Sequence, residues 1–244
     1  MNTPLSRTPG AARVAGGLGL AHLALLVTGL AMSGGGALIE DGTAGIEEAY
    51  GQGDLTMILG GWLVESIGFV LLVPVAVFLA STMGRSSQWG RWAARTGLVM
   101  AGTYVAVTLA VGFPAGAAAA YGFQHDLDVA AASALNSMRV FAYLLSLLCL
   151  GAHVTCVALS ALADGFGRRW VTGLGLLTGA ALLAAPPLAA VGQQDSPTLV
   201  YIVWWVGLCV ILLRHRPAPD ADHTATPGAG HTAAPGADAE LRGV

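Results

Sequence analysis

The chain alternates between long apolar runs and short polar breaks. A helix needs about 20 mainly apolar residues to cross the roughly 30 Å of hydrocarbon in a bilayer. Six runs are long enough, and they cover residues 12–32, 55–81, 95–119, 135–163, 170–191 and 198–213. The breaks between them are rich in charged residues and turn formers. The pattern predicts an all-α, polytopic membrane protein built as a bundle of six transmembrane helices.

Composition narrows the class of protein further. The 244 residues are 55% hydrophobic and 10% charged, whereas a soluble domain carries about a quarter charged residues. The basic residues are all Arg, and the formal net charge is −3, which excludes a nucleic-acid-binding domain. Cys149, Cys156 and Cys209 lie inside apolar runs, so we expect neither a disulfide nor a zinc cluster. The expected partner is the lipid bilayer, and no metal site is expected.

The arginines predict how the chain is oriented. Nine of them lie at the ends of the runs on one side of the predicted bundle: Arg7, Arg13, Arg85, Arg91, Arg95, Arg168, Arg169, Arg214 and Arg216. The loops on the other side are acidic. Because basic residues are retained in the cytoplasm, both termini are predicted to be cytoplasmic in a multi-pass protein of the plasma membrane.

Three segments follow from these patterns. Residues 1–11 form a cytoplasmic N-terminus, and residues 12–214 form the six-helix membrane domain. After residue 216 the chain becomes rich in Pro, Ala, Gly and Thr. Such a composition has no apolar face to bury, so residues 215–244 are predicted to form a disordered cytoplasmic tail.

The fourth run carries a polar face along its whole length, which we call the polar seam. Its members recur every three or four residues: Asn136, Arg139, Tyr143, Ser146, Cys149, His153, Cys156 and Ser160. This spacing places them on one face of a helix. Lipid solvates such a face poorly, so the seam should point into the bundle or into a wet cavity. A packing seam of small, hydrogen-bonding residues and the wall of a functional cavity both fit the pattern.

Glu65 is the one carboxylate inside a predicted span. It lies about ten residues from the outer end of the second run, which corresponds to roughly 15 Å. A carboxylate at this depth costs several kcal/mol unless it is protonated or paired. Arg139 is the obvious partner, because it lies near the outer end of the fourth run and its side chain can reach inward. Paired, the two would close the outer half of the bundle; unpaired, Glu65 would be a candidate proton carrier or general acid.

Two histidines are predicted at the same depth. His22 and His153 each lie about ten residues, or about 15 Å, from the cytoplasmic ends of the first and fourth runs. Equal depth on two helices is what axial ligation of a haem would require. It is also what a proton path, or two hydrogen-bonded core histidines, would show. A haem between His22 and His153 is therefore one hypothesis among three.

Several short motifs resemble a family of bacterial six-span membrane proteins known as a domain of unknown function. They are Gly151-Ala152-His153, the loop pair Arg168-Arg169, the stretch Gly173-Leu174-Gly175-Leu176-Leu177 with Gly179-Ala180, and the opening Ala12-Arg13-Val14-Ala15-Gly16. The likeness would cover about residues 11–214. The chain departs from the family pattern in having Gly167, not proline, before the loop arginines. The resemblance implies a six-span architecture and a role for His153, but no activity.

Three hypotheses of function remain. In the leading one, the chain is a non-enzymatic membrane protein that binds a small apolar molecule or a partner in its polar-lined interior, with His22, Glu65, Arg139, Tyr143 and His153 as the polar residues. The second is a membrane-embedded enzyme like the intramembrane terpene cyclases, with Glu65 as catalytic acid, although such enzymes usually employ a second carboxylate. The third is a proton-coupled transporter, which would need a homo-oligomer because no inverted repeat is visible. Soluble-enzyme motifs such as Gly-x-Ser-x-Gly or His-Glu-x-x-His are absent from the sequence.

Overall fold

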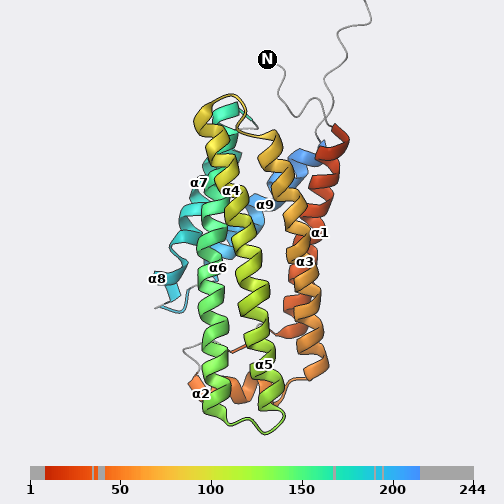
Figure 1. Ribbon diagram of the computed structural model, residues 1–244, viewed down its shortest axis with the longest axis vertical. Coiled ribbons are helices and arrows are strands. Elements are labelled where there is room, and N and C mark those ends of the chain that lie inside the picture. Colours follow the sequence, from red (N-terminus) through yellow and green to blue (C-terminus); the bar gives the residue numbers. More distant parts are fainter. Residues whose placement is uncertain are drawn as a thin grey trace, which may run out of the picture.

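The computed structural model describes residues 9–34, 36–37, 42–166, 169–189, 191–193 and 195–214. Within these residues the regular elements are helices (Figure 1): α1 (Pro9–Ser33), α2 (Gly42–Ile46), η2 (Glu47–Gly51), α3 (Leu55–Thr82), α4 (Gln88–Val107), η3 (Thr108–Gly112), α5 (Phe113–Phe123), α6 (Val129–Asp164), α7 (Arg169–Leu183), α8 (Ala185–Ala189) and α9 (Ser196–Arg214). The predictions for the disordered tail and for most of the cytoplasmic N-terminus lie outside the described residues.

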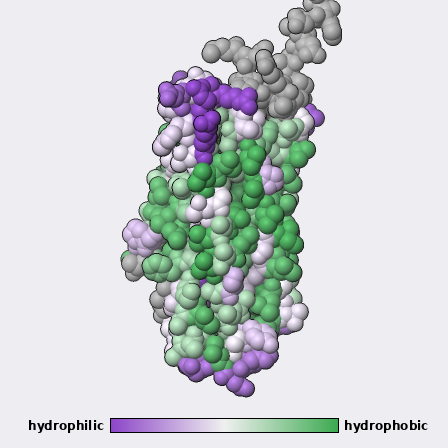
Figure 2. All heavy atoms as spheres, in the orientation of Figure 1, coloured by the Kyte–Doolittle hydropathy of each residue, from purple (hydrophilic) through white to green (hydrophobic). Residues whose placement is uncertain are grey.

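In the described part of the chain, five helical segments are long and apolar enough to cross a membrane. They are Gly10–Ser33, Leu55–Thr82, Gln88–Phe123, Val129–Asp164 and Ser196–Arg214. The third of them joins α4, η3 and α5 into one continuous helical stretch. Hydrophobic residues cover the visible side of the bundle between two ends where hydrophilic residues gather (Figure 2). The architecture is that of a helical membrane bundle.

The fifth predicted span, residues 170–191, is divided in the structure. Its helix α7 has 15 residues, which is about 22 Å, and a turn at Ala184 separates it from the five-residue α8. Pro186 and Pro187 explain the break, because proline has no N–H to donate to the carbonyl four residues earlier and its ring clashes with that turn. The structure therefore supports five long helices and one shorter apolar helix, and the count of six spans stays a prediction.

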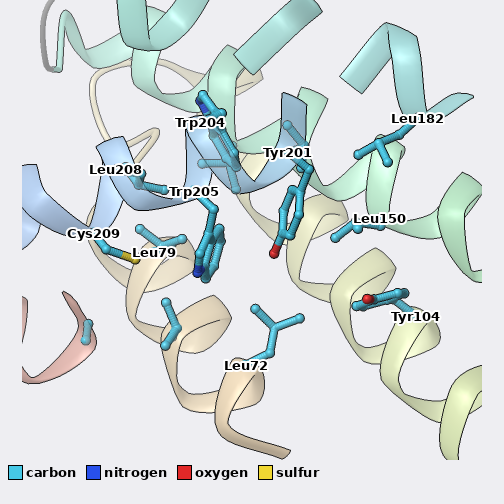
Figure 3. Close-up of a cluster of buried hydrophobic side chains, with 14 of the residues drawn as sticks. Leu72, Leu79, Tyr104, Leu150, Leu182, Tyr201, Trp204, Trp205, Leu208 and Cys209 are labelled. Carbon is cyan, nitrogen blue, oxygen red and sulfur yellow. The ribbon is translucent and has the colours of Figure 1, made fainter. Parts of the chain in front are cut away.

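The six longer helical segments form a ring. Going round the bundle, α1 packs on α3, α3 on α4, α4 on α6, α6 on α7, α7 on α9, and α9 on α1. Two buried tryptophans hold α9 in place (Figure 3). Trp205 donates from Nε1 to the Gly19 carbonyl of α1 over 2.9 Å, and Trp204 donates to the Val171 carbonyl of α7 over 3.0 Å. These bonds join the last helix to the first and close the ring.

The ring is closed only in its inner half, at the end where the arginines lie. Leu182 at the end of α7 packs against Gly151 of α6, and the turn before α9 reaches Tyr143, whose hydroxyl bonds to Asp195. Helix α6 continues outward from Tyr143 to Val129, which is 14 residues or about 21 Å. In Figure 1, α8 accordingly lies well short of the end where α5 and α6 meet. Among the described residues, neither α7 nor α9 extends into the outer half, which is built from α1, α3, α5 and α6.

Glycines allow α1 and α3 to approach closely at the outer end. A Cβ added at Gly61 would lie 2.6 Å from the Gly29 carbonyl oxygen and 2.9 Å from the Ser33 Cβ. Real Cβ atoms do not approach backbone this closely, so the two helices would have to separate. The small residues at this crossing are therefore required by the packing of the two backbones.

Two glycine variants test this contact. Gly61→Ala should destabilise the protein by about 1–3 kcal/mol, because the new methyl group meets backbone that cannot move independently. Gly102→Ala is the matched control, since Gly102 also lies inside a helix but has no atom within 4 Å of an added Cβ. That control should gain about 0.5–1 kcal/mol from helix propensity. Thermal unfolding in detergent measures both, and equal effects of the two changes would contradict the close contact.

Candidate functional site

A cavity of about 750 Å³ occupies the outer half of the bundle. Its walls come from α1, α3, the α4–η3–α5 helical stretch, α6 and the first turns of α9. The short hairpin of α7, α8 and α9 accounts for its position, because α9 fills the space between α1 and α6 only in the inner half. The cavity is thus the volume that a full-length final hairpin would occupy.

Most of the cavity wall is apolar. Leu26, Leu147 and Leu150 line its interior. Val27 and Leu30 on α1 and Leu199 on α9 also line it, and they are 52%, 55% and 67% exposed. These three residues therefore form a rim at the outer surface of the bundle. In a membrane bundle such an apolar surface would face lipid, and the rim would then open the cavity toward the bilayer.

One wall of the cavity is aromatic, and we call it the aromatic wall. It consists of Trp62 and Phe69 on α3, Tyr104 on α4 and Phe113 on α5. The ring centroids lie 5.1 Å apart for Phe69 and Tyr104, 5.6 Å for Phe69 and Phe113, and 6.4 Å for Trp62 and Phe113. These separations are typical of interacting aromatic pairs, so the rings form one contiguous surface.

Glu65 lies in the middle of the aromatic wall. It comes three residues after Trp62 and four before Phe69, so all three side chains share one face of α3. Its Oε1 accepts a hydrogen bond from the Ser33 hydroxyl of α1 over 3.2 Å. Gly29 lets α1 pass directly over the side chain, because an added Cβ there would overlap the Glu65 Cγ. The carboxyl group is therefore held at the cavity wall by α1 and α3 together.

A second carboxylate faces the same cavity. Asp195, in the turn before α9, accepts a hydrogen bond from the Tyr143 hydroxyl over 2.7 Å, and both residues line the cavity. The sequence alone places Asp195 in an outer loop and leaves Glu65 as the one intramembrane carboxylate. Because the hairpin stops short, the turn instead brings Asp195 to the cavity wall.

Arg139 lies at the outer end of the cavity within a network of hydrogen bonds. Its Nε donates to Asn136 Oδ1 over 3.0 Å, and its Nη2 donates to the Ala37 carbonyl. The Tyr50 hydroxyl of η2 donates to the same Asn136 oxygen over 2.8 Å. Burial raises the pKa of Tyr50, although the positive charge of Arg139 opposes this, so the hydroxyl stays protonated and can donate. The network fastens the segment before α3 across the outer end of the bundle.

Glu65 and Arg139 line the same cavity. Glu65 accepts a hydrogen bond from Ser33, and the interactions of Arg139 include hydrogen bonds to Asn136 and to the Ala37 carbonyl. Direct pairing of the two charges stays a prediction. Tyr143, the third polar residue expected in the interior, lines the same cavity.

His22 and His153 lie outside the large cavity, in the packed inner half. Both are completely buried. Each Nδ1 lies 2.8 Å from a glycine carbonyl of the neighbouring helix, that of Gly68 for His22 and that of Gly97 for His153. Each Nε2 is buried and has no hydrogen-bond partner. With Nδ1 as the donor, the two imidazoles act as matched cross-links between α1 and α3 and between α6 and α4.

The rest of the polar seam also faces inward. Asn136, Ser146, Cys149, Cys156 and Ser160 are buried along α6. In the outer part of α6 the seam belongs to the cavity, and in the inner part it meets other helices. Ser160, for example, donates a hydrogen bond to the Gly90 carbonyl of α4 over 3.4 Å. The seam therefore packs against other helices in the inner half and lines the cavity in the outer half, and a function of that cavity stays a prediction.

Comparisons with family models, with curated proteins and with solved structures find no match for the chain. The resemblance drawn from the short motifs thus stays a prediction. What can be inferred about function comes from the geometry of the cavity.

Replacing His153 tests its role as a cross-link. His153→Leu removes the ring donor and should lower the free energy of unfolding by about 1–2 kcal/mol. The conservative exposed change Val99→Leu serves as control, because Val99 is 61% exposed. Chemical unfolding of both variants measures the difference, and an unchanged free energy of unfolding in His153→Leu would contradict the cross-link.

An absorption spectrum of the wild-type protein tests the haem hypothesis, which predicts a Soret band that His153→Leu abolishes.

Proposed function

We propose that the chain is an integral membrane protein that takes a small, mainly apolar molecule from the bilayer into the outer cavity. The observation that carries this proposal is the apolar cavity of about 750 Å³ whose rim, at Val27, Leu30 and Leu199, lies on the lipid-facing surface. Its size is within the range of pockets for small molecules and cofactors, about 300–1,000 Å³.

The distribution of polar groups supports an amphiphilic ligand. Glu65, Tyr143 and Asp195 lie on the cavity wall, whereas the rim and much of the interior are aliphatic. A few placed polar groups in an otherwise apolar pocket orient a ligand and select it. A molecule with one polar group and an apolar chain or ring system could satisfy both kinds of surface.

We further propose that the chain lies in the plasma membrane with both termini in the cytoplasm. Arg85 in the α3–α4 connection and Arg91 in the first turn of α4 lie with Arg214 at the inner end of the ring, which supports this orientation. Helices α7 and α9 form a hairpin that begins and ends at the inner end of the ring, so the two termini lie on the same side. Reporters fused after Arg216 and inserted at Glu47 should lie on opposite sides, and the same side for both would refute the orientation.

Acid catalysis is the second candidate function. Asp195 supplies the second carboxylate that a cyclase-like enzyme would employ, and the aromatic wall around Glu65 could stabilise a positively charged intermediate. The transporter hypothesis receives less support, because His153 lies outside the cavity that Glu65 and Arg139 share.

Filling the cavity tests the proposed function. Leu26→Trp puts an indole into the cavity, and Leu30→Trp puts one across its rim. Each variant should co-purify with at least about tenfold less small molecule than wild type. A tenfold loss corresponds to roughly 1.4 kcal/mol of binding free energy. Leu177→Trp is the matched control, since Leu177 is 61% exposed on α7 and does not line the cavity. Native mass spectrometry of the three variants measures the bound mass. Equal retention in all three would contradict the proposal.

A further inference from the structure

A buried hydroxyl group in the cavity lacks a partner. Tyr201 of α9 is 2% exposed and lines the cavity, and its hydroxyl has no hydrogen-bond partner. Figure 3 shows the side chain pointing from α9 toward Leu72 and Tyr104. Buried polar atoms in proteins are nearly always paired, with protein, water or ligand. The Tyr201 hydroxyl is therefore available in the cavity to water or to a polar group of an occupant.

The charges around the cavity indicate the sign of that polar group. Two carboxylates, Glu65 and Asp195, and one guanidinium, Arg139, line the cavity. The guanidinium is bonded to Asn136 and to the Ala37 carbonyl at the outer end. Each carboxylate accepts one described hydrogen bond, from Ser33 or from Tyr143. A carboxylate can accept several, so both retain acceptor capacity toward the cavity.

The aromatic wall favours the same sign. Trp62 and Phe69 flank Glu65 on α3, and Tyr104 and Phe113 extend the surface. The face of an aromatic ring attracts a cation, and the attraction reaches about 2 kcal/mol where water is excluded. Rings next to a carboxylate are the environment in which proteins bind ammonium groups. A neutral hydroxyl could donate to the carboxylate but would gain no cation–π attraction, and an anion would be repelled.

We propose that the ligand of the outer cavity carries a positively charged amine, held by Glu65 and Asp195 against the aromatic wall. The inference rests on the proposed function, because it specifies the ligand of that cavity. The Tyr201 hydroxyl accepts a hydrogen bond from the ammonium group or from water beside it. The apolar part of the ligand lies along Leu26, Leu147 and Leu150 and leaves through the rim. An amine on an apolar body could come from an aminophospholipid of the bilayer or from a free lipophilic amine.

Two probes that differ only in their head group test the charge. Dodecylamine and dodecanol have the same chain, and at pH 7 the amine is protonated. The full chain in dodecyl maltoside is titrated with each probe, and bound probe is counted by native mass spectrometry. We expect dodecylamine to bind at least about tenfold more tightly than dodecanol. Glu65→Gln and Asp195→Asn should each remove most of this preference while keeping the binding of dodecanol.

The control variant is Asp126→Asn. Asp126 is an exposed acidic residue with a φ of 66°, a conformation that asparagine also adopts. It lies outside the cavity, so the preference for the amine should be unchanged. If Asp126→Asn also loses the preference for dodecylamine over dodecanol, the preference comes from surface charge, and the inference is overturned.

The remaining outcomes separate this inference from the proposed function. If dodecanol binds as tightly as dodecylamine and Leu30→Trp abolishes both, the cavity binds apolar molecules without selecting an amine, and only the inference fails. If neither probe binds to wild type, the proposed function fails too. It also fails if Leu30→Trp leaves the binding of both probes unchanged. Retention of phosphatidylethanolamine over phosphatidylglycerol of the same chains would assign the amine to a membrane lipid. If the two phospholipids are retained equally and dodecylamine is still preferred over dodecanol, the ligand is assigned to the free amines.

Discussion

The length of the final hairpin determines the rest of this structure. A membrane helix must keep its backbone hydrogen bonds internal, and the Pro186-Pro187 pair interrupts that pattern at the end of α7. The chain therefore turns back before it reaches the outer ends of α5 and α6. Because α9 starts at the level of Tyr143, its tryptophans can close the ring only in the inner half. The outer half is left with four helical walls and a cavity.

Buried polar groups have different surroundings in the two halves of the bundle. In the inner half, His22 and His153 each bond to a glycine carbonyl of the adjacent helix, and the surrounding side chains are packed and apolar. In the outer half, Glu65, Tyr143 and Asp195 border open volume. Polar groups in a membrane are costly unless they are paired, and the proposed function uses the polar groups that border the cavity. The same helix, α6, contributes to both halves through its polar seam.

Hydrophobic length and helical period were sufficient to predict much of this arrangement. The long apolar runs gave the helical class, and a spacing of three to four residues gave the inward direction of the seam on α6. The association of Glu65 with Arg139 was predicted from their depth, and the inward position of Tyr143 from its place in the seam. The break in α7 was also signalled, because the proline pair lies inside the predicted span, but its consequence depends on how far α6 extends beside it.

Other features required the tertiary structure. The sequence places Asp195 in an outer loop, and only the short hairpin of the structure brings it to the cavity. In the sequence, Tyr201 is one of several aromatic residues in an apolar run. The two histidines were predicted to lie at the same depth, but depth does not specify direction around a helix. Their rings turn toward Gly68 and Gly97 and away from the cavity. Trp62 and Phe69 could have been associated with Glu65 from their spacing on one helical face.

The depth of the turn before α9 tests the central claim most directly. A nitroxide placed at Val191 in cysteine-free protein, reconstituted in lipid, reports its depth through collisions with oxygen and with a water-soluble nickel chelate. Reference labels at Phe141, which is 72% exposed on α6, and at His125, in the outer turn after α5, mark the lipid-facing level and the outer end. The account predicts that position 191 matches position 141. A label at 191 that is as accessible to nickel as the one at 125 would show a full-length hairpin and contradict the origin of the cavity.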